Sequence, residues 1–256
     1  MRGYLLLTEA RSGSNWLGSM AISAGTLGRQ SEWLDKLNSG ADMRTMDLDE
    51  FMAAVVTKAS TPNNRFAFSI FPRYLFEFRE TYGKDFIDEC RARYPTALVS
   101  LRRRDVLRQA VSFARARQTK QYAATLPARR DARYDFDLIA QCYFYICESN
   151  AFWDSYLGLR ELEVDRYLYE DLLDDASGFI LNLATRLDVD RPTNFGARTS
   201  VQRDALTEEW LERFQQDLKA RSPLFAYDRR LPIKRSGRNL INLARRRLVG
   251  HHPFKY

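Results

Sequence analysis

Short apolar runs alternate with longer amphipathic stretches along most of this chain. Four apolar runs, bounded by turn-forming or charged residues, predict buried β-strands at residues 3–8, 65–71, 96–101 and 164–169. Apolar positions at helical spacing, or runs between breakers, predict helices at residues 15–23, 85–93, 106–118, 134–156, 176–187 and 207–220, the last capped by Thr207. Strands that alternate with helices favour an α/β fold with a central, mainly parallel sheet flanked by helices. Ligands of such sheets bind at the carboxyl ends of the strands.

The positive charge is concentrated at the end of the chain. The formal net charge is +7, but the segment after Asp228 has nine Lys and Arg and no acidic residue. The preceding 228 residues carry 31 basic and 33 acidic side chains. We therefore expect one domain over residues 1–228 and a basic extension over residues 229–256, packed on that domain. Because the excess charge belongs to the extension, we do not expect a nucleic-acid-binding domain. An alternative for the weakly amphipathic residues 238–249 is contact with an anionic membrane surface.

The inventory of reactive residues excludes several classes of site. The only histidines are His251 and His252, so a core histidine cannot serve as a catalytic base or metal ligand. Three cysteines without metal-type spacing favour a reduced, cytoplasmic protein. No apolar run approaches the roughly 20 residues that span a bilayer, and the run from Tyr4 to Leu7 is too brief for a signal-peptide core.

A first candidate for anion binding lies between the first predicted strand and helix. It comprises Arg11, Ser12, Gly13, Ser14, Asn15 and Trp16. Backbone N–H groups at a helix N-terminus attract anions, and a glycine lets the chain approach a phosphate closely. An ordinary Ser/Gly turn is the alternative. The segment lacks the GxxxxGK[ST] pattern, and with it the Lys and Ser/Thr pair that would hold a γ-phosphate and Mg²⁺.

A second candidate leaves the third predicted strand and enters the helix at 106–118. Arg104 and Ser112 lie on this segment, eight positions apart. A guanidinium fork and a hydroxyl suit a phosphate, and both side chains are placed to turn toward one ligand at the sheet edge. The alternative is a solvated basic helix start.

Together, these two segments resemble the sulfotransferases that use 3′-phosphoadenosine-5′-phosphosulfate (PAPS). In that superfamily a loop of the type (Lys/Arg)-Ser-Gly-(Thr/Ser)-x-Trp grips the 5′-phosphosulfate, and a later Arg and Ser bind the 3′-phosphate. Residues 169–172 (Tyr-Glu-Asp-Leu) match a further element of the superfamily. The chain is most similar to the bacterial trehalose sulfotransferase type, over residues 11–14, 103–119 and 202–214. It departs from that pattern at Ala10, where a proline is usual, and at Asn15.

The resemblance implies a P-loop-like sulfotransferase fold and a role for each candidate residue. Arg11 would contact the 5′-phosphate bridge and stabilise the leaving group, while residues 12–15 cradle the phosphosulfate and Trp16 either borders it or packs in the core. Arg104 and Ser112 would bind the 3′-phosphate, with Arg203 as a further candidate. No metal is expected, and 3′-phosphoadenosine-5′-phosphate (PAP) is the expected product. Glu9 lies beside the loop and must be paired or directed away from it.

The base for the acceptor hydroxyl is expected to be a glutamate. By resemblance to the trehalose type, the matching position is Glu32, and Asp35 is the alternative. A carboxylate that is half-buried beside Trp33 would have a raised pKa, which suits a general base.

The resemblance also implies a carbohydrate or glycolipid acceptor, trehalose among the candidates, and a homodimer. Aromatic side chains that could stack on sugar faces include Trp33, Tyr74, Phe76, Phe78, Tyr122 and Tyr134. Two other functions remain open from the sequence: a nucleotide phosphotransferase on a similar scaffold, and a non-enzymatic protein that binds anions or nucleic acid through the basic extension.

Overall fold

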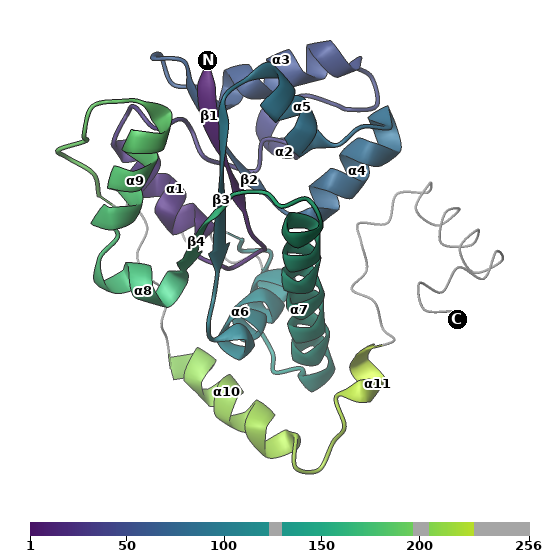
Figure 1. The fold of residues 1–256 in the computed structure, drawn as a ribbon. Coiled ribbons are helices and arrows are strands. Elements are labelled where there is room, and N and C mark those ends of the chain that lie inside the picture. Colours follow the sequence, from purple (N-terminus) through teal and green to yellow (C-terminus); the bar gives the residue numbers. More distant parts are fainter. Residues whose placement is uncertain (123–129, 197–204, 228–256) are drawn as a thin grey trace.

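Four parallel strands form the centre of the part of the protein that the structure describes, as the apolar runs predicted. The computed structural model describes residues 1–122, 130–196 and 205–227 (Figure 1). In these residues the strands form one sheet in the order β2-β1-β3-β4. They are β1 (Arg2–Leu7), β2 (Arg65–Ile70), β3 (Thr96–Arg102) and β4 (Asp165–Leu168). All three pairs of neighbouring strands are parallel, so the predicted α/β class with a mainly parallel sheet is confirmed.

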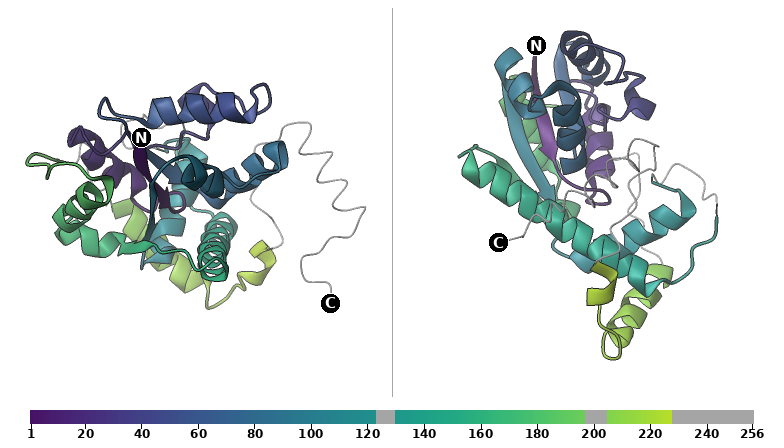
Figure 2. Two further views of the ribbon diagram at one scale, coloured as in Figure 1. Left: turned by 45° about the horizontal axis from the view of Figure 1, so that its top comes forward. Right: turned by 90° about the vertical axis from the view of Figure 1, so that its right-hand side faces the viewer.

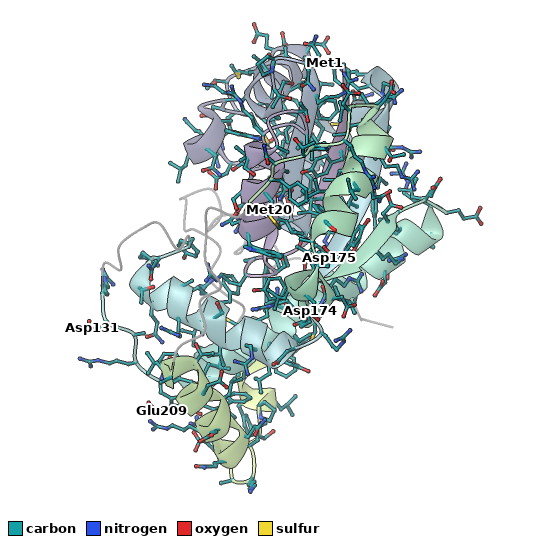
Figure 3. All side chains as sticks on the ribbon, turned by 90° about the vertical axis from the view of Figure 1, so that its left-hand side faces the viewer. Met1, Met20, Asp131, Asp174, Asp175 and Glu209 are labelled. Carbon is teal, nitrogen blue, oxygen red and sulfur yellow. The ribbon has the colours of Figure 1, made fainter. Side chains whose placement is uncertain are left out.

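Side chains of β1 alternate between the two faces of the sheet. Leu5 and Leu7 face a core cluster shared with α3 (Leu48–Ala59), α4 (Pro72–Tyr82) and α5 (Phe86–Arg93). Tyr4 and Leu6 face the opposite cluster, to which α1 (Ser14–Ser23), α8 (Tyr169–Asp174) and α9 (Ser177–Leu187) contribute. Figure 3 shows the side on which α8 and α9 lie. This alternation follows from the two-residue period of a strand, and each fully buried leucine stabilises the fold by about 1.5–3 kcal/mol.

A third core cluster lies off the sheet, beyond the carboxyl ends of the strands. It joins α6 (Val106–Thr119), α7 (Phe136–Leu159), α10 (Ala205–Asp217) and α11 (Leu224–Tyr227) (Figures 1 and 2). The helix α7 also reaches the sheet, because Trp153 is buried in the first cluster and its Nε1 donates to the Thr8 carbonyl at 3.1 Å. The carboxyl end of β1 is therefore enclosed by helices that are distant in sequence.

Most predicted elements are confirmed within a few residues, and the differences have physical reasons. The sequence reading missed α3, whose first turn is fixed by a capping box between Asp47 and Glu50, and also α2 (Lys36–Ser39), α4 and α8. Thr207 was expected to cap its helix, which is wrong: α10 begins at Ala205, and the buried Thr207 hydroxyl accepts a hydrogen bond from Arg115. The stretch 238–249 lies outside the described residues, and the division at residue 228 stays a prediction. Within the described ranges, no helix combines the length and apolarity that crossing a bilayer requires.

Candidate functional site

The loop between β1 and α1 has a strained, closely packed backbone. Arg11 and Gly13 adopt left-handed conformations, with φ of 63° and 102°. A Cβ atom at Gly13 would lie 2.3 Å from the Tyr169 ring, so only glycine fits beneath that ring. The Thr8 hydroxyl donates to the Leu101 carbonyl at 2.8 Å, which fixes the start of the loop against β3. Such strain in a defined loop is typical of a functional turn.

The loop presents the N-terminus of α1 rather than a set of hydroxyl groups. The N-cap of α1 is Gly13, and no side chain of the described residues caps the helix. The N–H groups of Ser14 and Asn15 therefore keep their capacity to bind an anion, whereas that of Trp16 donates to the Gly13 carbonyl at 3.0 Å. The hydroxyl of the buried Ser12 lies 2.7 Å from that of Thr8, whereas Asn15 is exposed. Trp16 packs edge-on against Tyr169, with ring centroids 5.9 Å apart.

The structure brings the two sequence motifs together through Arg11 and Ser112. Arg11 Nε donates to Ser112 Oγ at 3.0 Å, and one of its terminal nitrogens donates to the Tyr122 carbonyl at 2.8 Å. The two residues are 101 positions apart in sequence but face each other because α6 leaves β3, the neighbour of β1. The first strand–helix junction and the middle of α6 thus form one site.

Two further arginines complete this site. Burial lowers the pKa of Arg11, and the positive charges of Arg103 and Arg115 lower it further. The Arg103 guanidinium lies 4.3 Å from the Tyr169 ring centroid, and its buried Nε has no hydrogen-bond partner among the described residues. Arg115 donates to Thr207 Oγ1 at 2.6 Å. Like charges brought this close repel one another, and a bound phosphate would relieve that repulsion. The donor set therefore fits a phosphate group.

The Arg104 side chain pairs with an acidic residue of α8. An Arg104 terminal nitrogen lies 2.7 Å from Asp171 Oδ1, and both side chains are largely exposed. The backbone N–H of Arg104 donates to Glu170 at 2.8 Å, so residues 170 and 171 hold the strand end. Arg203 lies outside the described residues. Sequence reasoning missed Arg103 and Arg115; the position of Arg115 one helical turn after Ser112 was a signal for it.

Glu32 lies near the carboxyl end of β2. The preceding residue, Ser31, accepts a hydrogen bond from the Ser69 backbone N–H at 2.8 Å, which attaches this loop to the strand. One oxygen of Glu32, Oε2, accepts from the Tyr74 hydroxyl at 2.5 Å and from Arg73 at 3.2 Å. Burial raises the pKa of Glu32 above its ordinary value, although these two donors oppose the rise. Asp35 instead caps α2, accepting from the Leu37 N–H at 2.9 Å, which makes Glu32 the better candidate base.

Glu9 lies beside the anion-binding loop, but its carboxylate is bonded to other groups. Its buried carboxylate accepts from the Ala10 N–H at 2.8 Å and from Ser149 Oγ at 2.9 Å. It therefore bonds to α7, whereas Arg11 bonds to α6. Burial raises the pKa of Glu9, and these hydrogen bonds oppose that rise.

Comparison with known protein families assigns the chain. Residues 83–217, just over half of its length, match the family described as Stf0 sulphotransferase. No curated protein matches the chain. The chain belongs to the Stf0 sulphotransferase family and is an enzyme, a sulfotransferase, which confirms the resemblance found in the sequence. The matched segment includes Arg103, Ser112 and Arg115, whereas the loop of Arg11 and the position of Glu32 lie before it.

Proposed function

We propose that this Stf0 sulphotransferase transfers a sulfuryl group from PAPS to a hydroxyl of a carbohydrate or glycolipid acceptor, trehalose among the candidates. The observation that carries the proposal is the convergence of Arg11, Arg103 and Arg115 with Ser112 at the carboxyl end of β1. A donor with a 3′-phosphate and a 5′-phosphosulfate supplies two anionic groups for such a site.

Binding of the donor is divided between two segments. The N–H groups of residues 13–15 and the Arg11 guanidinium hold the 5′-phosphosulfate, at the N-terminus of α1, which has no side-chain cap. The Ser12 N–H, expected to join them, instead donates to the Glu9 carbonyl at 3.3 Å. Ser112 binds the 3′-phosphate, as the sequence predicted, and Arg103 and Arg115 join it. The predicted roles of Arg104 and Arg203 in 3′-phosphate binding stay predictions.

Glu32 acts as the general base in this proposal. It takes the proton of the acceptor hydroxyl as the acceptor oxygen forms its bond to sulfur and the bond from sulfur to the 5′-phosphate oxygen breaks. Arg11 stabilises the negative charge that develops on the departing PAP. Burial raises the pKa of Glu32 toward neutral pH, and a general base is most effective when its pKa lies near the working pH.

The acceptor class comes from the family resemblance. Of the aromatic residues expected to stack on sugars, Phe76 and Tyr122 are exposed, whereas Tyr74 and Phe78 are buried in the core. Tyr134 instead donates to Asp217 at 2.8 Å. The homodimer and the cytoplasmic location remain predictions from the sequence.

Contact with a membrane through residues 229–256 is a further part of the proposal. These residues lie outside the described part of the chain, but α11, just before them, exposes Leu224 and Phe225 to 66% and 78%. Exposed apolar residues next to basic ones suit an anionic bilayer surface. We expect deletion of residues 229–256 to reduce sedimentation with phosphatidylserine vesicles and to leave PAP affinity unchanged. Unchanged sedimentation would reject this contact.

Isothermal titration with PAP, and with AMP for comparison, tests the donor site. We expect PAP to bind with micromolar affinity and AMP to bind much more weakly, because AMP lacks the 3′-phosphate. Arg103→Ala and Arg115→Ala should each weaken PAP binding about tenfold or more, since a hydrogen bond to a charged group contributes about 1.5–3 kcal/mol. The control is Arg102→Ala, which should leave PAP binding unchanged, because the Arg102 guanidinium is paired with Asp154 at 2.8 Å. Arg104→Ala decides whether Arg104 is a ligand, and no PAP binding at millimolar concentration would reject the PAPS donor.

Transfer of label from ³⁵S-PAPS to trehalose and to glycolipids tests the acceptor and the base. We expect Glu32→Gln to lower kcat by about 10²–10⁴, the usual contribution of a general base. Binding of PAP without labelling of any sugar or glycolipid would keep the donor site but reject the acceptor class.

A further inference from the structure

The proposed base is held on one side only. Both hydrogen bonds to the Glu32 carboxylate among the described residues end on the same oxygen, Oε2, which accepts from Tyr74 and from Arg73. In the described part of the chain, Oε1 makes no hydrogen bond, and the Glu32 side chain is 25% exposed. The carboxylate thus has one fixed oxygen and one that can meet an incoming group.

The two donors also hold each other. An Arg73 terminal nitrogen donates to the Tyr74 hydroxyl oxygen at 2.8 Å, and the guanidinium lies 4.6 Å from the Tyr74 ring centroid. Both residues lie in the first turn of α4, immediately after Pro72, which presets the backbone at a helix start. Because Tyr74 is 2% exposed, its hydroxyl is fixed by core packing rather than by solvent.

We propose that Tyr74 and Arg73 are positioning residues that hold Oε2 of Glu32, so that Oε1 is left to take the proton of the acceptor hydroxyl. The inference rests on the proposed function, because it assigns supporting residues to the proposed base. Neither residue touches the reacting atoms in this arrangement. Both act through Glu32, by fixing its orientation and by favouring its charged form.

The groups around Glu32 determine the direction in which its pKa is shifted. Burial raises the pKa of Glu32, Asp35 raises it further, and Tyr74 and Arg73 lower it. Arg73 is also shared with a second carboxylate, since its charge favours ionised Glu9 across the site.

Other groups act on Arg73 or its neighbours rather than on Glu32. Tyr145 of α7 interacts with both Arg73 and Glu9, and Arg117 of α6 acts on Tyr145. The positive charges of Arg73 and Arg44 lower the pKa of Glu77 in α4, against the rise caused by burial. Because Tyr74 and Arg73 are the groups that lower the pKa of Glu32, loss of either should raise that pKa.

A carboxyl ¹³C titration of the full-length protein measures this effect directly. The signal of Glu32 is assigned by its absence in Glu32→Gln. We expect Tyr74→Phe and Arg73→Gln each to raise the titration midpoint by about one pH unit, with a smaller rise in Arg73→Lys, which keeps the charge. Unchanged midpoints in Tyr74→Phe and Arg73→Gln would overturn the proposal. The Arg73 variants keep the test valid if Tyr74→Phe does not fold.

The chain contains a matched control. Tyr156 donates to Asp85 at 2.9 Å and accepts from Arg160 at 2.7 Å, so it forms the same tyrosine–carboxylate–arginine arrangement in another part of the molecule. Tyr156→Phe should leave the Glu32 midpoint unchanged. An equal shift in this variant would mean that the effect is a general loss of stability, and would count against the proposal.

The pH profile of sulfotransfer separates this inference from the proposed function. A base acts only when deprotonated, so the acidic limb of kcat/KM should move to higher pH by the same amount as the titration midpoint. The affinity for PAP should stay at the wild-type value. Loss of activity in Glu32→Gln with an unshifted limb in Tyr74→Phe and Arg73→Gln would overturn the positioning role alone. Full activity in Glu32→Gln would overturn both the base and its positioning.

Discussion

Gly13 combines two constraints that only a glycine side chain can satisfy. Its backbone is left-handed, and the ring of Tyr169 occupies the space where a Cβ would stand. Gly83 is a useful comparison, because it is also left-handed but has no atom within 4 Å of a Cβ position. The comparison separates the backbone constraint from the packing constraint.

We expect Gly13→Ala to destabilise the protein by more than Gly83→Ala. A left-handed alanine costs about 1–2 kcal/mol, and Gly13→Ala must also displace the Tyr169 ring. It should weaken PAP binding too, since the N-terminus of α1 would move. Chemical denaturation and PAP titration of both variants measure these effects. Equal stability losses and wild-type PAP affinity in both variants would contradict the packing argument.

At the scale of elements, Glu9 connects the loop after β1 to α7. Its hydrogen bond from Ser149 and the bond from Trp153 to the Thr8 carbonyl attach α7 to the end of the strand. The connection places a carboxylate in the core, where burial raises its pKa above the ordinary value of 4.5. Because the folded state then holds the proton more tightly than the unfolded state, the contribution of Glu9 to stability falls as pH rises from about 4.5 through the raised pKa.

Glu9→Gln should remove this pH dependence. The free energy of unfolding of the wild type, relative to Glu9→Gln, is expected to decrease as pH rises from about 4.5 and to level off above the raised pKa of Glu9. Urea denaturation of both proteins between about pH 4.5 and about pH 8 measures the difference. If the wild type instead gained relative stability with rising pH, the carboxylate would be stabilised on folding and the argument would fail.

At the scale of the whole molecule, the phosphate site depends on a cluster that lies off the sheet. Trp210 of α10 is 2% exposed, and it packs with α6 and α7. The same helix carries Thr207, the partner of Arg115 (Figure 3, where Glu209 marks α10). Packing of this cluster therefore also places one of the three site arginines.

Trp210→Ala should lower stability and PAP affinity together. Loss of a buried aromatic side chain costs about 3–5 kcal/mol, and Arg115 would lose its partner on α10. Phe86→Ala, in the cluster on the α5 face of the sheet, should cost a similar amount of stability without weakening PAP binding. Denaturation and PAP titration below the unfolding transition compare the two. Equal PAP affinity in both variants would show that α10 does not position Arg115.

Much of the fold could be predicted because strands and helices each impose a characteristic spacing of apolar residues along the sequence. The apolar runs predicted all four described strands. Residues 11–13 of the first motif lie in the loop between β1 and α1, as predicted, and residues 14–16 form the first turn of α1. Helix α4 was missed because charged residues interrupt the apolar ones from Arg73 to Tyr82, although Tyr74, Leu75 and Phe78 form a buried stripe at helical spacing. That omission hid Arg73 and Tyr74, the partners of Glu32.

The sequence by itself determined the parallel α/β architecture, the family, and the pairing of a loop near residue 12 with a helix near residue 112. These follow from the local spacing of apolar residues and from the order of the motifs, both of which can be read directly from the sequence. Only the tertiary structure decided which arginines share the site. At the end of β3, Arg103 lies over Tyr169 while its neighbour Arg104 meets Asp171. Such a choice depends on side-chain direction at a strand end and on partners 60 or more residues away, which spacing along the chain cannot specify.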